Sequence, residues 1–252
     1  MPLGREIPAR TIEAAHVKLG RIGPHYAKTL IRLLAAHALA EKLTAIGYER
    51  ALESLSDPAL RPAVQKNLDE ERRHASTVYR ALRGLGVSQE EADRLMIPAL
   101  KAPSFEAPLR FARSASGELD VLMGSLSLDM TGLLMIGINY KDSSYAPHAR
   151  AADEILDDEA EHEMFASSEL ARSVDRLGAE AVLAALRRWL PAAVNFFGPP
   201  GTGFGYDCIR FGLKSRDNGD LMQLYLSMLE RRLAGVGIDL PRLTPHYPHA
   251  LA

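Results

Sequence analysis

Two short motifs that combine acidic residues with a histidine are repeated in this chain. The first is EERRH, from Glu70 to His74, and the second is DEAEH, from Asp158 to His162, so the histidines are 88 positions apart. In each motif a glutamate precedes the histidine by three positions, and residues three apart lie on the same face of a helix. Each motif can therefore direct one carboxylate and one imidazole toward the same point, as a metal site requires.

Two further carboxylates follow the same register. Glu41 precedes Glu71 by 30 positions, Asp129 precedes Glu159 by 30, and the offset between these two upstream acids is again 88. A dimetal-carboxylate bundle takes one carboxylate from each of two helices and Glu-x-x-His from each of the other two. The sequence therefore predicts a dinuclear metal site with six catalytic ligands: Glu41, Glu71, His74, Asp129, Glu159 and His162. By bundle geometry Glu71 and Glu159 bridge the two ions, and each ion has one histidine.

The ligand set and its neighbours indicate the kind of metal. Four carboxylates and two imidazoles without a thiolate favour iron, with manganese as the alternative, over zinc or copper. The acids that precede the two glutamates, Glu70 and Asp158, are candidates to accept a hydrogen bond from the distal N–H of a ligand histidine. His37, one turn before Glu41, is a candidate for the cavity wall. Glu163 is a reserve ligand, whereas Glu161 should face away.

An ordinary structural explanation exists for each residue taken alone. A single Glu-x-x-His on a charged helix is usually solvated surface, and Glu41 could pair outside with Lys42 or Arg50. Asp129 resists this interpretation because its flanks, from Val121 to Ile138, contain no other charge. The repetition in register favours a metal site.

The elements that must position these residues are helices. The hydrophobic periodicity predicts a first helix over about 28–52, with Leu30, Leu34, His37, Glu41, Ala45 and Tyr48 on one face. Asp57 and Pro58 resemble an N-cap and first helical position, which predicts a second helix over about 58–83. Third and fourth helices are expected over 118–139 and 147–177, and additional helices over 179–234, with a bend near Pro191. Two helices, a long proline-containing crossover and two more helices predict an all-α, ferritin-like four-helix bundle with one long crossover and extra C-terminal helices. No linker divides the chain, so we expect 1–252 to form a single domain.

Composition narrows the functional classes. The chain has 252 residues, 47% hydrophobic and 25% charged, with a net charge of −2, which gives no support to a nucleic-acid partner. Cys208 is the only cysteine, so no intrachain disulfide can form, and we expect a small core residue there and a cytoplasmic location. The start of the chain lacks a signal-peptide pattern. The apolar segment around Asp129 is expected to be a buried bundle helix and not a membrane span.

A glycine-rich stretch, GPPGTGFG from Gly198 to Gly205, resembles the opening of a phosphate-binding loop. Such a loop needs a lysine and a serine or threonine after the last glycine, and no strand precedes this one. We therefore expect a turn after the fifth helix. Side chains expected near the metal cavity are Leu30, Leu34, Leu126, Met130, Ile155 and Phe165.

With these residues in place, the chain resembles the catalytic subunit of phenylacetyl-CoA epoxidase and, more distantly, its benzoyl-CoA relative, which are ferritin-like di-iron oxygenases. The resemblance covers about residues 25 to 240. It rests on KTLIRLLAAHALAE (28–41), EERRHASTVYRAL (70–82), SSYAPHARA (143–151), DEAEH (158–162) and FGPP (197–200). It implies iron ligands at the six positions given above, including an aspartate on the third helix.

The sequence thus predicts a non-haem di-iron monooxygenase. We expect two iron ions, O₂, an organic small-molecule substrate such as an aromatic acyl-CoA, and a separate reductase component as electron donor. We also expect a homo- or hetero-oligomer, and neither nucleic acid nor membrane as partner. The alternatives are a non-catalytic ferritin-like partner subunit, an iron-storage protein and a dimanganese catalase.

Overall fold

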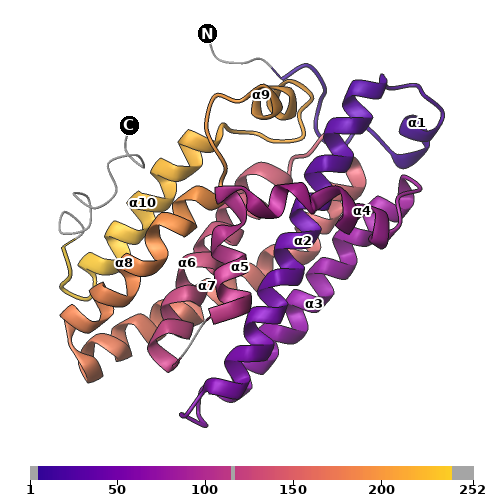
Figure 1. Cartoon of the computed structure of the whole chain (residues 1–252). Helices are drawn as coiled ribbons and strands as arrows, with labels where there is room; N and C mark the ends of the chain where they lie inside the picture. Colours follow the sequence, from indigo (N-terminus) through magenta and orange to yellow (C-terminus); the bar gives the residue numbers. More distant parts are fainter. Residues whose placement is uncertain (1–4, 115–116, 240–252) are drawn as a thin grey trace.

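The structure, a computed structural model, describes residues 5–114 and 117–239, and these are almost entirely helical (Figure 1). Apart from an isolated bridge between Ile12 and Tyr145, these residues contain no β-structure. The helices are α1 Ala14–Lys18, α2 Pro24–Ser54, α3 Arg61–Gly84, α4 Gln89–Met96, α5 Glu106–Ser114, α6 Glu118–Leu134, α7 Ala146–Leu177, α8 Ala179–Phe196, α9 Gly203–Arg210 and α10 Asn218–Ala234. Two 3₁₀-helices, η1 Pro98–Lys101 and η2 Pro103–Phe105, precede α5, and a π-helix, η3 Met135–Tyr140, continues α6.

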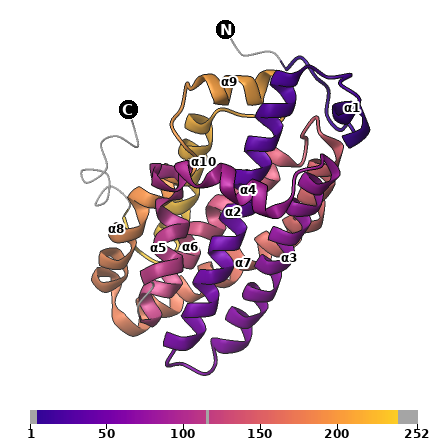
Figure 2. The same ribbon diagram turned by 45° about the vertical axis from the view of Figure 1, so that its right-hand side comes forward.

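Four long helices form the bundle. α2 packs along α3, and α6 packs along α7, while α3 also contacts α7 (Figures 1 and 2). The segment from α4 to α5 crosses between the two pairs and packs on α2. α8 covers α6 and α5, and α10 contacts α6. This arrangement brings the acidic motifs of α3 and α7 together at the centre of the bundle.

The start of α3 differs from the prediction. The helix begins at Arg61 with Pro62 in its first turn, and not at Pro58. Asp57 caps a preceding turn: its carboxylate accepts a hydrogen bond from the Ala59 N–H at 2.8 Å, and its carbonyl oxygen accepts one from Leu60. Leu60 is buried in the core, so packing of this turn decides where the helix starts.

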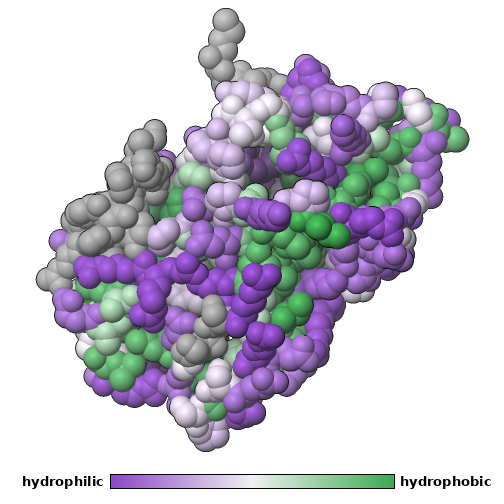
Figure 3. Space-filling view, viewed as in Figure 1, coloured by the Kyte–Doolittle hydropathy of each residue, from purple (hydrophilic) through white to green (hydrophobic). Residues whose placement is uncertain are grey.

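α6 is apolar on every side because it is enclosed on every side. Its side chains are buried from Val121 to Thr131, and Trp189 of α8 lies so close that a Cβ on Gly124 would be 2.8 Å from the indole ring. The segment Glu118–Tyr140 is long and apolar enough to cross a membrane, but 78% of its most apolar window is buried inside the protein. Such burial is typical of a core helix in a soluble protein. On the face drawn in Figure 3 hydrophilic side chains predominate, with smaller apolar patches between them.

The π-helix η3 is a local change in the helix that carries Asp129. It adds a residue per turn directly after α6, and such insertions are frequent at functional sites. Asn139 of η3 accepts hydrogen bonds from the backbone N–H groups of Ser215 and Arg216, at 3.1 and 2.9 Å. This contact holds the segment between α9 and α10 against the bundle beside the site described next.

Candidate metal centre

The structure brings all six predicted ligands together in the bundle interior. Each helix of the bundle contributes: Glu41 from α2, Glu71 and His74 from α3, Asp129 from α6, and Glu159 and His162 from α7. All six side chains are buried; the most exposed residue, Glu41, retains only 8% of its accessible surface. Buried carboxylates at this density are costly unless cations or protons compensate them.

Two groups of ligand atoms lie close enough to hold metal ions. Glu41, Glu71, His74 and Glu159 form one group, and Glu71, Asp129 and His162 form the other, with the ligand atoms of each group within 4.8 Å of one another. Glu71 belongs to both groups, which is the position of a bridging carboxylate. Glu159 belongs only to the first, at 3.5 Å from His74 Nδ1, although the sequence predicts a bridge for it too.

Both histidines present the same nitrogen to the centre. Among the described residues, Nδ1 of His74, Nδ1 of His162 and one Glu71 oxygen are buried and have no hydrogen-bond partner. Unpaired buried polar atoms are rare in folded proteins, and each calls for a missing partner. Because all three atoms face one cluster of carboxylates, a pair of divalent cations fits as that partner, with the four acids neutralising the charge of the cations.

The distal nitrogens of the two histidines are held by the acids that precede the two glutamates, and the pairing crosses between helices. His74 Nε2 lies 3.0 Å from Asp158, and His162 Nε2 lies 2.9 Å from Glu70. Each motif thus orients the histidine of the other motif. A carboxylate on Nε2 selects the tautomer that leaves Nδ1 free to ligate a metal. The sequence predicts the role of these two acids but not this exchange.

Asp129 is held by neutral donors. The Tyr48 hydroxyl lies 3.0 Å from one carboxylate oxygen, and the Ser125 hydroxyl donates to the other at 2.7 Å. Burial raises the pKa of Asp129 to about 7, against the opposing effects of His162 and these hydroxyls. Burial, and then the charges of Glu41 and Glu159, raise the pKa of Glu71 well above its ordinary value. Without metal, the cluster therefore retains protons that bound cations would displace.

Glu41 has a different partner. His37 Nε2 lies 2.7 Å from its carboxylate, and His37 Nδ1 lies 3.1 Å from Nε2 of buried His148. Burial alone would raise the pKa of Glu41, but His37, together with the charge of His74 and a hydrogen bond from Glu71, outweighs burial and lowers the pKa to about 2. Burial lowers the pKa of His74, but the carboxylates of Glu159, Glu41 and Asp158 together outweigh burial and raise that pKa to about 9.

The reserve ligand does not join the cluster. Glu163 is buried, but both of its oxygens accept hydrogen bonds from the Arg232 guanidinium of α10, at 2.8 and 2.9 Å. Glu161 faces outward and pairs with Lys66, as predicted from its helical angle.

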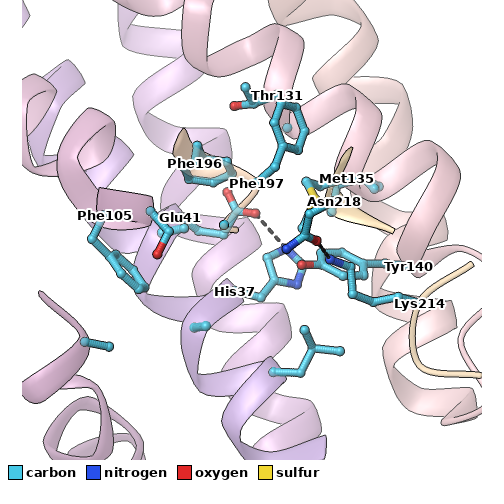
Figure 4. A pocket seen from close by; sticks show the side chains of 18 of the residues that line it. His37, Glu41, Phe105, Thr131, Met135, Tyr140, Phe196, Phe197, Lys214 and Asn218 are labelled. Atoms are coloured by element: carbon cyan, nitrogen blue, oxygen red, sulfur yellow. Dashed lines mark hydrogen bonds and ion pairs between the residues drawn. The ribbon is translucent and has the colours of Figure 1, made fainter. Parts of the chain in front are cut away.

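A cavity of about 360 Å³ opens beside the carboxylates (Figure 4). Glu41, Glu71, Asp129 and Glu159 line it, and aromatic and apolar side chains form much of the remaining wall, among them Phe105, Phe196, Phe197, Met135 and Ile136. None of the six side chains that the sequence offers as candidates for the cavity wall lines the cavity. They pack in or against the two hydrophobic cores, the alternative that the sequence also allows. Residues of η2 and of the segment 196–205 also line the cavity.

Gly132 contributes to the site, although nothing in the sequence alone indicates its role. Gly132 leaves room for Glu159, since a Cβ there would be 2.3 Å from a Glu159 oxygen. The GPPGTGFG stretch is a turn followed by α9, as expected, and it also lines the cavity. Cys208 is buried and free, in agreement with a core position.

The comparisons with known proteins identify the fold. No family model matches the chain, and no curated protein matches its sequence. A solved structure of a Synechococcus protein with aldehyde deformylating oxidase activity superposes with a TM-score of 0.65, at 19% identity over 90% of this chain and 97% of that one. The protein therefore has an all-helical, ferritin-like fold, as the sequence predicts. Within that fold it carries a carboxylate–histidine cluster able to hold metal.

Proposed function

We propose that this protein is a non-haem di-iron oxygenase that uses O₂ to oxygenate an organic substrate. The observation that carries the proposal is the convergence of two unpaired histidine Nδ1 atoms on a carboxylate shared by two ligand groups. Oxygen-rich sites with two imidazoles suit iron, with manganese as the alternative. The fold likeness to a protein with oxidase activity is compatible with this chemistry.

Bound iron would supply electrons and a coordination site for O₂; the residues of this chain supply the rest. Glu70 and Asp158 orient the two imidazoles, and Tyr48 and Ser125 orient Asp129. His37, in contact with Glu41, is placed to hold a proton at the edge of the cavity. Aromatic and apolar side chains form much of the wall of the space next to the metal ligands, where a substrate would react, and such a wall disfavours water there.

The cavity favours an enzyme over a storage protein or a non-catalytic partner subunit, because neither requires a largely apolar cavity in contact with the metal ligands. The resemblance to acyl-CoA epoxidases suggests an aromatic acyl-CoA as substrate. A separate reductase would deliver the electrons, and association with a second copy or a partner subunit belongs to the same proposal, as does a cytoplasmic location.

The test is O₂ consumption by iron-loaded protein. We expect chemically reduced, iron-loaded protein to consume O₂ with a transient visible absorption band, and Glu159→Ala to bind no iron while keeping its helical circular dichroism. Normal iron loading of Glu159→Ala, or an iron-loaded wild-type protein inert to O₂, would contradict the proposal.

A further inference from the structure

The cavity holds a buried cation that the metal chemistry does not use. Lys214, between α9 and α10, lines the cavity and retains only 6% of its accessible surface. Among the described residues no carboxylate lies within ion-pair distance of its ammonium group, whose hydrogen-bond partner is the neutral amide oxygen of Asn218. A buried, unpaired ammonium is costly, so a lysine retained there is a candidate functional group.

The surrounding chain fixes Lys214 in place. Its backbone N–H donates to the carbonyl oxygen of Cys208 at 3.1 Å, and Asn139 holds the next two residues. Asn218 donates to the carbonyl oxygen of Pro199 at 3.2 Å, which ties the lysine to the turn that lines the cavity. Figure 4 shows Lys214 and Asn218 entering the cavity beside Tyr140 and His37, with Glu41 across from them.

The acid whose charge acts on Lys214 is hydrogen-bonded to other groups. Asp217 acts on Lys214 only at a distance, and its carboxylate accepts hydrogen bonds from the backbone N–H groups of Gly219 and Gly201, at 2.8 and 3.4 Å. Burial lowers the pKa of Lys214, as expected for an ammonium group without a counter-ion. A second cation, Arg32, also lines the cavity, but its guanidinium stacks on the Phe204 ring at 4.4 Å.

We propose that Lys214 is the anchor for an anionic oxygen group on an otherwise apolar substrate, whose apolar part then lies along the aromatic wall toward the metal ligands. Turnover of such a substrate rests on the proposed function, whereas binding of its anionic group to Lys214 depends only on the cavity. A carboxylate and a phosphate monoester share this chemistry, and either would gain a charge-assisted hydrogen bond from Lys214. An ion pair with a bound anion would also remove the cost of the unpaired ammonium.

The experiment compares three probes of similar size: 4-phenylbutanoate, the neutral 4-phenylbutanamide of the same shape, and 3-phenylpropyl phosphate. Their affinities for metal-loaded protein are measured by isothermal titration calorimetry. We expect the carboxylate or the phosphate to bind about tenfold or more tightly than the amide, because hydrogen bonds to charged groups are the stronger ones. Whichever anion is preferred identifies the source of the anionic group.

Lys214→Met is the decisive variant, and Lys28→Met, which removes an exposed lysine of α2, is the matched control. Lys214→Met should fold at least as stably as wild type, since it removes a buried charge, and should bind the anionic and neutral probes equally. Lys28→Met should keep the preference. If wild type binds the anionic and neutral probes equally, or binds neither, the proposal is overturned. It is also overturned if Lys214→Met keeps the preference for the anion, since the anion would then bind the metal directly.

Metal content is measured on the same samples, so the two proposals fail separately. If the protein takes up no iron, the oxygenase proposal fails, and the comparison of wild type with Lys214→Met on metal-free protein still decides the anchor. If iron loads normally and the preference for the anion is absent, only the anchor fails.

Discussion

Glu41 and Asp129 occupy equivalent places in the repeated pattern, yet their surroundings differ. Glu41 accepts from an imidazole, His37, and its pKa is lowered to about 2. Asp129 accepts from the hydroxyls of Tyr48 and Ser125, and burial raises its pKa to about 7. The repeat places a carboxylate at each position, but the neighbours from other helices decide whether that carboxylate keeps its charge in the absence of metal.

The comparison implies different tasks for the two sides. The Glu41 side adjoins a titratable chain, in which His37 contacts both Glu41 and His148, and it opens to the cavity. On the Asp129 side, Tyr48 and Ser125 are buried, both hydroxyls donate to the carboxylate, and their oxygens lie 2.7 Å apart, so the carboxylate is fixed in a neutral frame. We infer that proton transfer belongs to the first side and rigid metal binding to the second.

The largest effect is expected at the residue that both sides share. Glu71→Gln removes a charged oxygen donor from both ligand groups, so we expect loss of both iron ions with the helical content retained. Iron per chain, measured by mass spectrometry of the metal, checks this. Glu161→Gln, which changes an exposed glutamate of α7, is the control and should load normally. If the Glu71→Gln protein still binds two ions, Glu71 is not the ligand shared by the two metal ions.

The next prediction separates Glu41 from Asp129 in metal-free protein. The folded pKa of Asp129, about 7, exceeds its ordinary value of 3.8, so its contribution to stability falls as the pH rises from about 4 to 7. The folded pKa of Glu41, about 2, is below its ordinary value of 4.5, so its contribution is present above 4.5 and is lost as the pH falls toward 2.

At about pH 8, metal-free Asp129→Asn should therefore be more stable than wild type, and Glu41→Gln less stable, each by roughly 2 kcal/mol. Urea unfolding over a range of pH measures both. The advantage of Asp129→Asn should disappear below about pH 4, and the deficit of Glu41→Gln should narrow between about pH 4.5 and 2. Changes of the same sign in both variants would show that the two environments do not differ as described.

A smaller effect is expected from Gly132→Ala. The added methyl group would meet a Glu159 oxygen at 2.3 Å, so this carboxylate must move away from His74. We expect iron affinity to fall about tenfold, within the range typical for changes that displace a ligand's support. Gly137→Ala, whose Cβ would meet only a Leu156 methyl group at 3.2 Å, is the matched control. Equal affinity in both variants would contradict the position of Glu159.

The smallest effects should come from the acids on the distal histidine nitrogens. Glu70→Gln and Asp158→Asn keep the shape of the side chain but weaken its hold on the imidazole. Losing such a partner altogether typically costs ten- to a hundredfold in metal affinity, so we expect these isosteric changes to cost less than about tenfold. The Asp158 side chain is 20% exposed and that of Glu70 is 9% exposed, so solvent screens Asp158 more and Asp158→Asn should lose less. Competition titrations with a metal chelator measure both, and a larger loss for Asp158→Asn would reverse the predicted order.

The sequence predicts the features of the site that follow from helical periodicity, which are the positions of the six ligands. The spacings of 30 and 88 placed six side chains on four inward faces, and the structure brings those six together. It did not predict that Glu70 holds His162 while Asp158 holds His74, since that exchange depends on how α3 and α7 are packed. Glu163 has the right helical angle for a ligand, but Arg232 of a distant helix takes its carboxylate.

The cavity was the least predictable part, because its walls come from segments with no shared period. η2, η3 and the turn at 196–205 meet there only through tertiary contacts. Lys214 lies outside every helix, and nothing in its local sequence distinguishes it from an exposed lysine. Likewise, the start of α3 followed the packing of Leu60 rather than the capping signal of Asp57 and Pro58.

The central claim is that one glutamate joins two metal ions, and Mössbauer spectroscopy of protein loaded anaerobically with ⁵⁷Fe tests it most directly. After exposure to O₂, the account predicts two irons per chain that are magnetically coupled through shared ligands, with the coupled signal absent in Glu71→Gln. A single uncoupled iron per chain, or iron bound equally well without Glu71, would contradict it.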